Sequence, residues 1–170
     1  MRFLSTSPEQ TRALGRAIAE LARTGDVIAL SGDLGAGKTV LAQGFVAGLG
    51  VDEPVVSPTF TLVRQYRGRL PVVHVDVYRL GHVQELVDLA LDEIPGTDGV
   101  TIVEWGDRVA GALGAQRLDV WIERPPDDAA GAGDDARLIT VNAFGGAWAA
   151  RLSALAELVD SRVDAVVGEV

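Results

Sequence analysis

The segment GDLGAGKT, residues 32–39, decides the fold of this 170-residue chain. It fits the pattern G-x-x-x-x-G-K-[ST] with every fixed position filled. Phosphate oxygens crowd together with several negative charges, so binding them needs many N–H donors in a small concavity without Cβ atoms in the way. We therefore predict that the segment binds nucleotide phosphates through Gly32, Asp33, Leu34, Gly35, Ala36, Gly37, Lys38 and Thr39.

The two residues that end the segment have separate predicted roles. Lys38 would place a compact positive charge between the β- and γ-phosphates, and the Thr39 hydroxyl would give one oxygen to Mg²⁺. Of the 15 basic residues, Lys38 is the only lysine. This position therefore needs an ammonium, where every other cationic position uses a guanidinium.

The flanking sequence has the order of strand, loop and helix that a phosphate-binding loop requires. Residues 26–31 (DVIALS) are a short apolar run typical of a buried strand, and residues 39–49 have a helical pattern that ends at a glycine. An earlier helix is predicted to start with Ser7 as N-cap and Pro8 in its first turn, and to stop before Gly25.

Downstream, strand and helix patterns alternate as in an α/β fold. The β-rich runs 59–66 and 70–78 predict a hairpin, and residues 125–136, rich in Pro, Gly and Asp, predict a surface loop. The other expected elements are a helix at 82–91, strands at 100–105, 118–124 and 137–143, a short helix at 108–113 and a last helix at 147–159. The predicted fold is a P-loop NTPase-like three-layer sandwich with a mixed, mostly parallel central sheet that includes an antiparallel hairpin.

Two acidic residues are candidates for binding the metal and the attacking water. Asp76 ends the apolar run VVHVD, residues 72–76, and Glu104 follows the apolar run 100–103. Ligands of α/β proteins gather at the carboxyl ends of strands, so both groups could converge near the γ-phosphate. This reasoning leaves open which of the two ligates Mg²⁺ directly.

Two residues beside these carboxylates have open interpretations. His74 alternates with Asp76 and is expected on the same side of its strand, either as a relay to the site or as a satisfied core histidine. Trp105 is equally consistent with core packing and with a partner contact.

Composition limits the other possibilities. The chain has no cysteine and 2 histidines, which excludes a thiolate zinc site and leaves oxygen ligands for any metal. The net charge of −9 disfavours direct binding to nucleic acid. No apolar run suits a signal peptide or a membrane span, so we expect one cytoplasmic domain over residues 1–170, frayed after about residue 160.

The predicted nucleotide is ATP. GTPases read guanine with an Asn-Lys-x-Asp loop, whereas the only asparagine here is Asn142 and the only lysine is Lys38. Residues 5–11 could cover the adenine. The leading hypothesis is Mg²⁺-dependent ATP hydrolysis, slow without partners, because the sequence assigns no arginine finger; Arg79 is a candidate.

Two alternatives come from other classes. A small-metabolite P-loop kinase would need a mobile lid, which Arg64, Arg67 and Arg69 could form, although these arginines also suit a solvated hairpin. A non-catalytic module would use the bound nucleotide only to recruit partners.

Four ordered motifs make the chain resemble the TsaE family, also called YjeE. They are GDLGAGKT at 32–39, SPTFTLV at 57–63, HVDVYRL at 74–80 and VEW at 103–105. The resemblance implies an ATPase required for threonylcarbamoyladenosine at position 37 of tRNAs reading ANN codons, working with TsaB and TsaD and reaching tRNA through them.

The resemblance also implies residue roles. It places Mg²⁺ on Thr39 and Glu104, and gives Asp76 the role of the Walker-B carboxylate. It also implies that Thr59, His74 and Trp105 are switch or partner-linked residues. Thr59 lies where P-loop proteins have their first switch segment and could sense the γ-phosphate, although a simple proline turn is the alternative.

Overall fold

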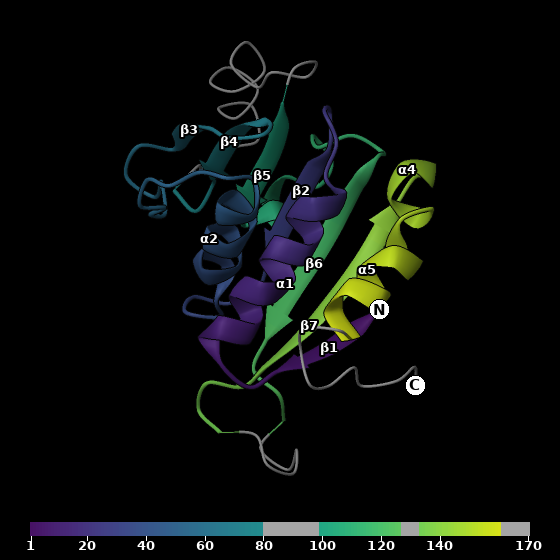
Figure 1. Ribbon diagram of the computed structural model, residues 1–170. Coiled ribbons are helices and arrows are strands. Elements are labelled where there is room, and N and C mark those ends of the chain that lie inside the picture. Colours follow the sequence, from purple (N-terminus) through teal and green to yellow (C-terminus); the bar gives the residue numbers. More distant parts are fainter. Residues whose placement is uncertain (80–98, 127–132, 161–170) are drawn as a thin grey trace.

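The computed structural model describes residues 1–79, 99–126 and 133–160 (Figure 1). Its elements are β1 (Arg2–Ser5), α1 (Pro8–Leu21), β2 (Val27–Ser31), α2 (Lys38–Gly48), β3 (Val63–Arg67), β4 (Pro71–Asp76), β5 (Val100–Glu104), the 3-10 helix η1 (Gly106–Val109), β6 (Arg117–Glu123), β7 (Arg137–Phe144), α4 (Gly146–Ala149) and α5 (Leu152–Asp160). The helix predicted at 82–91 and the tail after residue 160 lie outside the described residues.

Among the described residues, seven strands form one mixed sheet in the order β1-β7-β6-β2-β5-β4-β3. The central strands β6, β2, β5 and β4 are parallel to one another. The predicted hairpin, β3 with β4, makes one antiparallel edge, and β7 with β1 makes the other. The α/β class with a mixed sheet is confirmed. Strand β1 was not predicted, because its four residues are too few to show a pattern.

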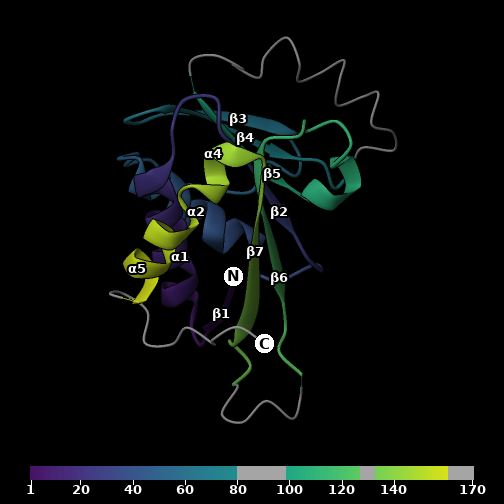
Figure 2. The same ribbon diagram turned by 90° about the vertical axis from the view of Figure 1, so that its right-hand side faces the viewer.

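The sheet has helices α1, α2 and α5 on one face, and η1 lies on the other (Figures 1 and 2). The larger apolar core lies between these helices and the sheet. A smaller cluster of valines from β4 and β5 packs with Val109 of η1. The central strand β5 is buried along its whole length, as expected for a parallel strand that is covered on both sides.

Helix α1 begins as predicted and holds α2 at close range. The Ser7 hydroxyl accepts from the backbone N–H of Gln10 at 3.2 Å, while the Gln10 side chain accepts from the N–H of Thr6 at 2.7 Å. Where the two helices meet, a Cβ on Gly15 or Gly44 would collide with the backbone of the other helix. This close contact fixes the helix that follows the phosphate-binding loop.

Three predicted elements have different bounds in the structure. Residues 59–62 form a turn rather than the start of a strand, because the N–H groups of Thr61 and Leu62 both donate to the Pro58 carbonyl. The predicted helix at 108–113 is instead the earlier 3-10 helix η1. The single helix predicted at 147–159 is two helices, α4 and α5, which separate next to Arg151.

A buried ion pair explains the break before α5. The Arg151 guanidinium binds both carboxylate oxygens of Asp26, at 2.7 and 2.8 Å, and donates to the Leu21 carbonyl at 2.7 Å. It also lies 3.9 Å from the centroid of the Trp148 ring. These contacts join the start of β2 to the end of α1 and to the C-terminal helices.

We predict that Asp26→Asn lowers the free energy of unfolding by about 3 kcal/mol or more, because it leaves the buried Arg151 charge uncompensated. Urea denaturation measures this loss. The matched control is Asp119→Asn, which breaks the more exposed pair with Arg117 and should cost about 1 kcal/mol or less. Equal losses in the two variants would contradict the prediction.

Candidate nucleotide-binding site

The loop between β2 and α2 has the backbone conformation that its glycines predict. Gly32, Gly35 and Gly37 have φ angles of 135°, 77° and 112°, in the region that favours glycine. Helix α2 starts directly after the loop at Lys38. Its first N–H groups and the positive end of its dipole therefore lie at the loop, where an anion is stabilised.

Lys38 lies under the loop and is only 5% exposed. Its Nζ donates to the carbonyls of Gly32 at 2.7 Å and Asp33 at 2.8 Å. It also lies 3.7 Å from the centroid of the Trp105 ring. Burial lowers the pKa of Lys38, while the nearby carboxylates, chiefly Glu104, act in the opposite direction. A bound polyphosphate would add negative charge that favours the ammonium form.

Glu104 connects the loop helix to the centre of the sheet. The Thr39 hydroxyl donates to its carboxylate, with Oγ1 lying 2.9 Å from Oε2 and 3.1 Å from Oε1. Nε2 of His74 lies 2.9 Å from Glu104 Oε1 and both residues are buried. The predicted residues Thr39, Glu104 and His74 therefore form one continuous chain of contacts, in which His74 fixes the position of the Glu104 carboxylate.

Asp76 holds the segment that precedes β3. Register pairs it with Glu104 on the adjacent parallel strand, as the sequence predicted. Its Oδ2 accepts from the hydroxyls of Ser57, at 2.7 Å, and Thr59, at 2.5 Å. Its Oδ1 accepts from the N–H of Tyr78 at 2.9 Å. A metal's water shell at this carboxylate would compete with the two hydroxyls.

Trp105 forms a side wall of the site. It has a positive φ of 63°, which turns its ring out of the line of β5. The ring lies between Lys38 and Arg108, whose guanidinium carbon is 4.7 Å from the ring centroid, and it packs against Tyr78 with centroids 4.9 Å apart. Trp105 therefore lines the site and also packs against the smaller apolar cluster around Val103 and Val109.

A cavity of about 310 Å³ joins these groups. Of the residues predicted as catalytic or switch-linked, only His74 does not line it, since it lies behind Glu104. The lining residues are Leu34, Gly35, Gly37, Lys38, Thr39, Val40, Ser57, Thr59, Asp76, Glu104 and Trp105. Sequence reasoning missed Ser57 as a contact of Asp76, although it lies in the quoted SPTFTLV motif. It also missed Arg108, for which the sequence has no signal.

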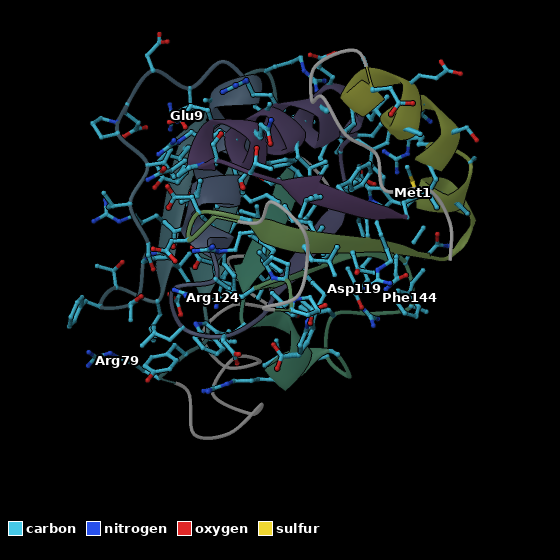
Figure 3. All side chains as sticks on the ribbon, turned by 90° about the horizontal axis from the view of Figure 1, so that it is seen from below. Met1, Glu9, Arg79, Asp119, Arg124 and Phe144 are labelled. Atoms are coloured by element: carbon cyan, nitrogen blue, oxygen red, sulfur yellow. The ribbon has the colours of Figure 1, made fainter. Side chains whose placement is uncertain are left out.

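Arg79, considered as an arginine finger, and Arg69, considered for a kinase lid, do not line this cavity. Arg79 lies at the periphery of the molecule (Figure 3), with its guanidinium carbon 4.4 Å from the centroid of the exposed Phe60 ring. Arg69 donates to the carbonyls of Ala19 and Ala22 at the end of α1. Arg69 is therefore occupied in holding the hairpin to α1, which weakens the hypothesis of a kinase lid.

The donor set of the site suits Mg²⁺. Thr39, Glu104 and Asp76 offer only oxygen atoms, which are the ligands that this hard cation prefers. Among the described residues, no group of three or more His, Cys, Asp or Glu side chains could hold a metal by itself.

A second, smaller cavity of about 80 Å³ lies next to the loop. The start of α1 contributes Pro8 and Thr11, and the loop region contributes Gly37 and Val40. Asp135 and Arg137 close it from the start of β7. The segment 5–11, predicted to cover the base, therefore does reach a cavity beside the loop.

Together, the buried parallel strand, the glycine loop, the helix and the carboxylates at neighbouring strand ends define a P-loop nucleotide-binding protein. Within the described residues, no helix is long and apolar enough to cross a membrane.

Comparison with known proteins specifies the family. The family model described as "Threonylcarbamoyl adenosine biosynthesis protein TsaE" matches residues 5–130. The chain is 43% identical over 146 residues to the tRNA threonylcarbamoyladenosine biosynthesis protein TsaE of Bacillus subtilis, covering 85% of this chain and 87% of the relative. It is 45% identical over 142 residues to the TsaE protein of Streptomyces coelicolor, covering 81% and 93%. The chain belongs to the TsaE family.

A solved structure supports the fold over the full length. The crystal structure of YdiB from Bacillus subtilis aligns with a TM-score of 0.72 and 38% sequence identity. The alignment covers 97% of this chain and 96% of the YdiB chain.

The glycines of the loop should differ in their tolerance of alanine. A Cβ on Gly32 would collide with the Ile122 carbonyl, whereas a Cβ on Gly35 would meet nothing within 4 Å. We predict that Gly32→Ala lowers the free energy of unfolding by about 3 kcal/mol or more, and that Gly35→Ala costs only the strain of its positive φ, about 1 kcal/mol. Urea denaturation of both variants tests this; a greater loss in Gly35→Ala would contradict it.

Proposed function

We propose that this chain is a Mg²⁺-dependent ATPase that supports the threonylcarbamoyladenosine modification of tRNA. The observation that carries the proposal is the hydrogen bond from the Thr39 hydroxyl to the Glu104 carboxylate. It brings the hydroxyl that follows the phosphate-binding loop and a carboxylate from the central sheet to one point. Those are the two oxygen ligands that a P-loop enzyme uses around its metal.

The residues of the cavity would have separate roles in ATP hydrolysis. When bound, Mg²⁺ would neutralise charge that develops on the β- and γ-phosphates. Thr39 and Glu104 would hold the metal, and Asp76 would hold its water shell. Lys38 would leave the carbonyls of Gly32 and Asp33 and turn to the phosphates.

The position of Thr59 supports a role in sensing the γ-phosphate. Its hydroxyl is bonded to Asp76 and it lines the cavity. If the Asp76 carboxylate takes up water molecules of the metal, Thr59 is released to donate elsewhere. Trp105, against Lys38, would report on the position of that side chain and so on the occupancy of the site.

The base would occupy the smaller cavity beside Val40. When the phosphates of a nucleotide lie at the loop, its ribose and base extend along the first turn of α2. The smaller cavity adjoins that turn. An Asn-Lys-x-Asp loop for guanine is excluded by the composition, because Asn142 and Lys38 are the only residues of those types. We therefore infer that the bound nucleotide is ATP.

The biological role rests on the family. The relatives are named as tRNA threonylcarbamoyladenosine biosynthesis proteins. We infer that this chain works in the cytoplasm with TsaB and TsaD and reaches tRNA through them. Its net charge of −9 supports indirect contact with tRNA, because an acidic protein repels a polyanion. The whole chain, residues 1–170, would act as one ATPase domain.

The proposal predicts that Lys38→Ala and Thr39→Ala abolish ATP hydrolysis measured with purified protein, Mg²⁺, TsaB and TsaD. Removal of one such group costs on the order of a hundredfold or more in rate. Glu104→Ala should clearly raise the Mg²⁺ concentration needed for half-maximal rate. Its effect on fold stability, measured as the melting temperature, should be small by comparison. Hydrolysis at the unmodified rate in Lys38→Ala would refute the site.

The same assay separates the alternatives. Hydrolysis that TsaB and TsaD stimulate supports a partnered ATPase. Nucleotide binding without turnover under any condition would favour the non-catalytic module. Transfer of the γ-phosphate to a small metabolite in place of water would favour a kinase.

A further inference from the structure

The crest of the phosphate-binding loop has few side chains to hold it. The Leu34 side chain is 80% exposed, and the glycines on either side of Ala36 have none. A loop that directs its N–H groups towards a polyphosphate must direct carbonyl oxygens elsewhere, and those oxygens need donors. Lys38 supplies donors for two of them, the carbonyls of Gly32 and Asp33.

Arg137 supplies donors for the next carbonyls of the same loop. It is the first residue of β7, about a hundred positions further along the chain. Its Nε donates to the Ala36 carbonyl at 2.8 Å, and its Nη2 lies 3.5 Å from the Gly35 carbonyl. Two cations therefore share the carbonyls of the loop, one from inside the loop and one from outside.

The guanidinium is itself held in place. Its Nη1 donates to the carbonyls of Asp134, at 2.8 Å, and Ala136, at 2.7 Å. A planar fork with fixed donors can bridge two backbone segments at once, which an ammonium on a flexible stem does poorly. Arg137 thus joins the loop to the start of β7, the strand next to the edge strand β1.

Arg137 also brings a positive charge next to the loop. Within residues 1–79, 99–126 and 133–160, no carboxylate lies within ion-pair distance of its guanidinium. A guanidinium with no ion-pair partner among the described residues contributes a positive potential beside the loop, where phosphates would bind.

We propose that Arg137 is a positioning residue that holds the phosphate-binding loop in its anion-binding conformation. The proposal rests on the proposed function, since it assumes that Lys38 turns to the phosphates when nucleotide binds. Lys38 then releases the carbonyls of Gly32 and Asp33, and Arg137 keeps those of Gly35 and Ala36.

Nucleotide affinity tests the proposal. We expect Arg137→Gln to raise the Kd for inorganic tripolyphosphate about tenfold, because charge-assisted hydrogen bonds to the loop are lost, and to raise that for MgATP at least as much, because Arg137 also lines the cavity proposed for the base. The matched control is Arg117→Gln. It removes the same charge at the first residue of β6, which pairs with Phe144 at the end of β7 opposite to Arg137. Its partners Asp119 and Phe144 lie on the opposite side of the molecule from Arg79 (Figure 3).

Each other outcome has a definite meaning. A loss for ATP with unchanged tripolyphosphate affinity would show that Arg137 acts only through the base, whose proposed cavity it lines, and would overturn the positioning role. Unchanged affinity for both ligands, or an equal loss in Arg117→Gln, would also overturn it. If the unmodified protein binds neither ligand, the proposed function itself fails.

A second readout does not depend on nucleotide. Amide hydrogen exchange in the peptide spanning residues 32–39 should be faster in nucleotide-free Arg137→Gln than in the unmodified protein or in Arg117→Gln, because the loop opens more often. Arg137→Lys keeps the charge but not the fork, and should show most of the same loss of affinity. Full affinity in Arg137→Lys would reduce the role to charge alone and refute the bridge.

Discussion

A loop that binds polyphosphate with its backbone must keep its peptide groups turned one way, and the rest of the structure serves that constraint. Glycines at positive φ make the curvature possible, but they bring no side chains to hold it. The loop is therefore held from its surroundings. Strand β2 before it is buried in the middle of the sheet, and helix α2 after it is locked to α1 by the contact at Gly15 and Gly44. Rigidity at a site built from backbone comes from the scaffold on both sides.

The parts of this arrangement that sequence reasoning could predict are those with strong local patterns. The motif at 32–39 required a strand before it and a helix after it, and both are present. Asp76 and Glu104 could be placed at one edge because each ends an apolar run, and parallel strands align such ends. Ser7 could be predicted as an N-cap because its side chain suits that position.

The parts that could not be predicted depend on contacts between distant residues. Residues 59–62 have the composition of a strand, but hydrogen bonds to Pro58 and Asp76 turn them away from the sheet. The helical pattern at 147–159 is continuous in sequence, yet the ion pair with Asp26 breaks it at Arg151. The contact of Arg137 with the loop likewise joins positions that no local pattern relates. In each case a tertiary partner decides between two locally acceptable conformations.

The pairing of the first strand with one of the last has a consequence for the order of folding during synthesis. Strand β1 has its partner in β7, and Asp26, at the start of the strand that leads to the loop, has its partner in Arg151. Ribosomes release the chain from its N-terminus, so more than a hundred further residues must be synthesised after β1 and Asp26 before their partners emerge. Contacts of such long sequence separation form late and slowly. A ribosome-bound chain that has not reached residue 151 therefore carries the whole glycine motif while Asp26, just before the strand that leads to it, still lacks its partner.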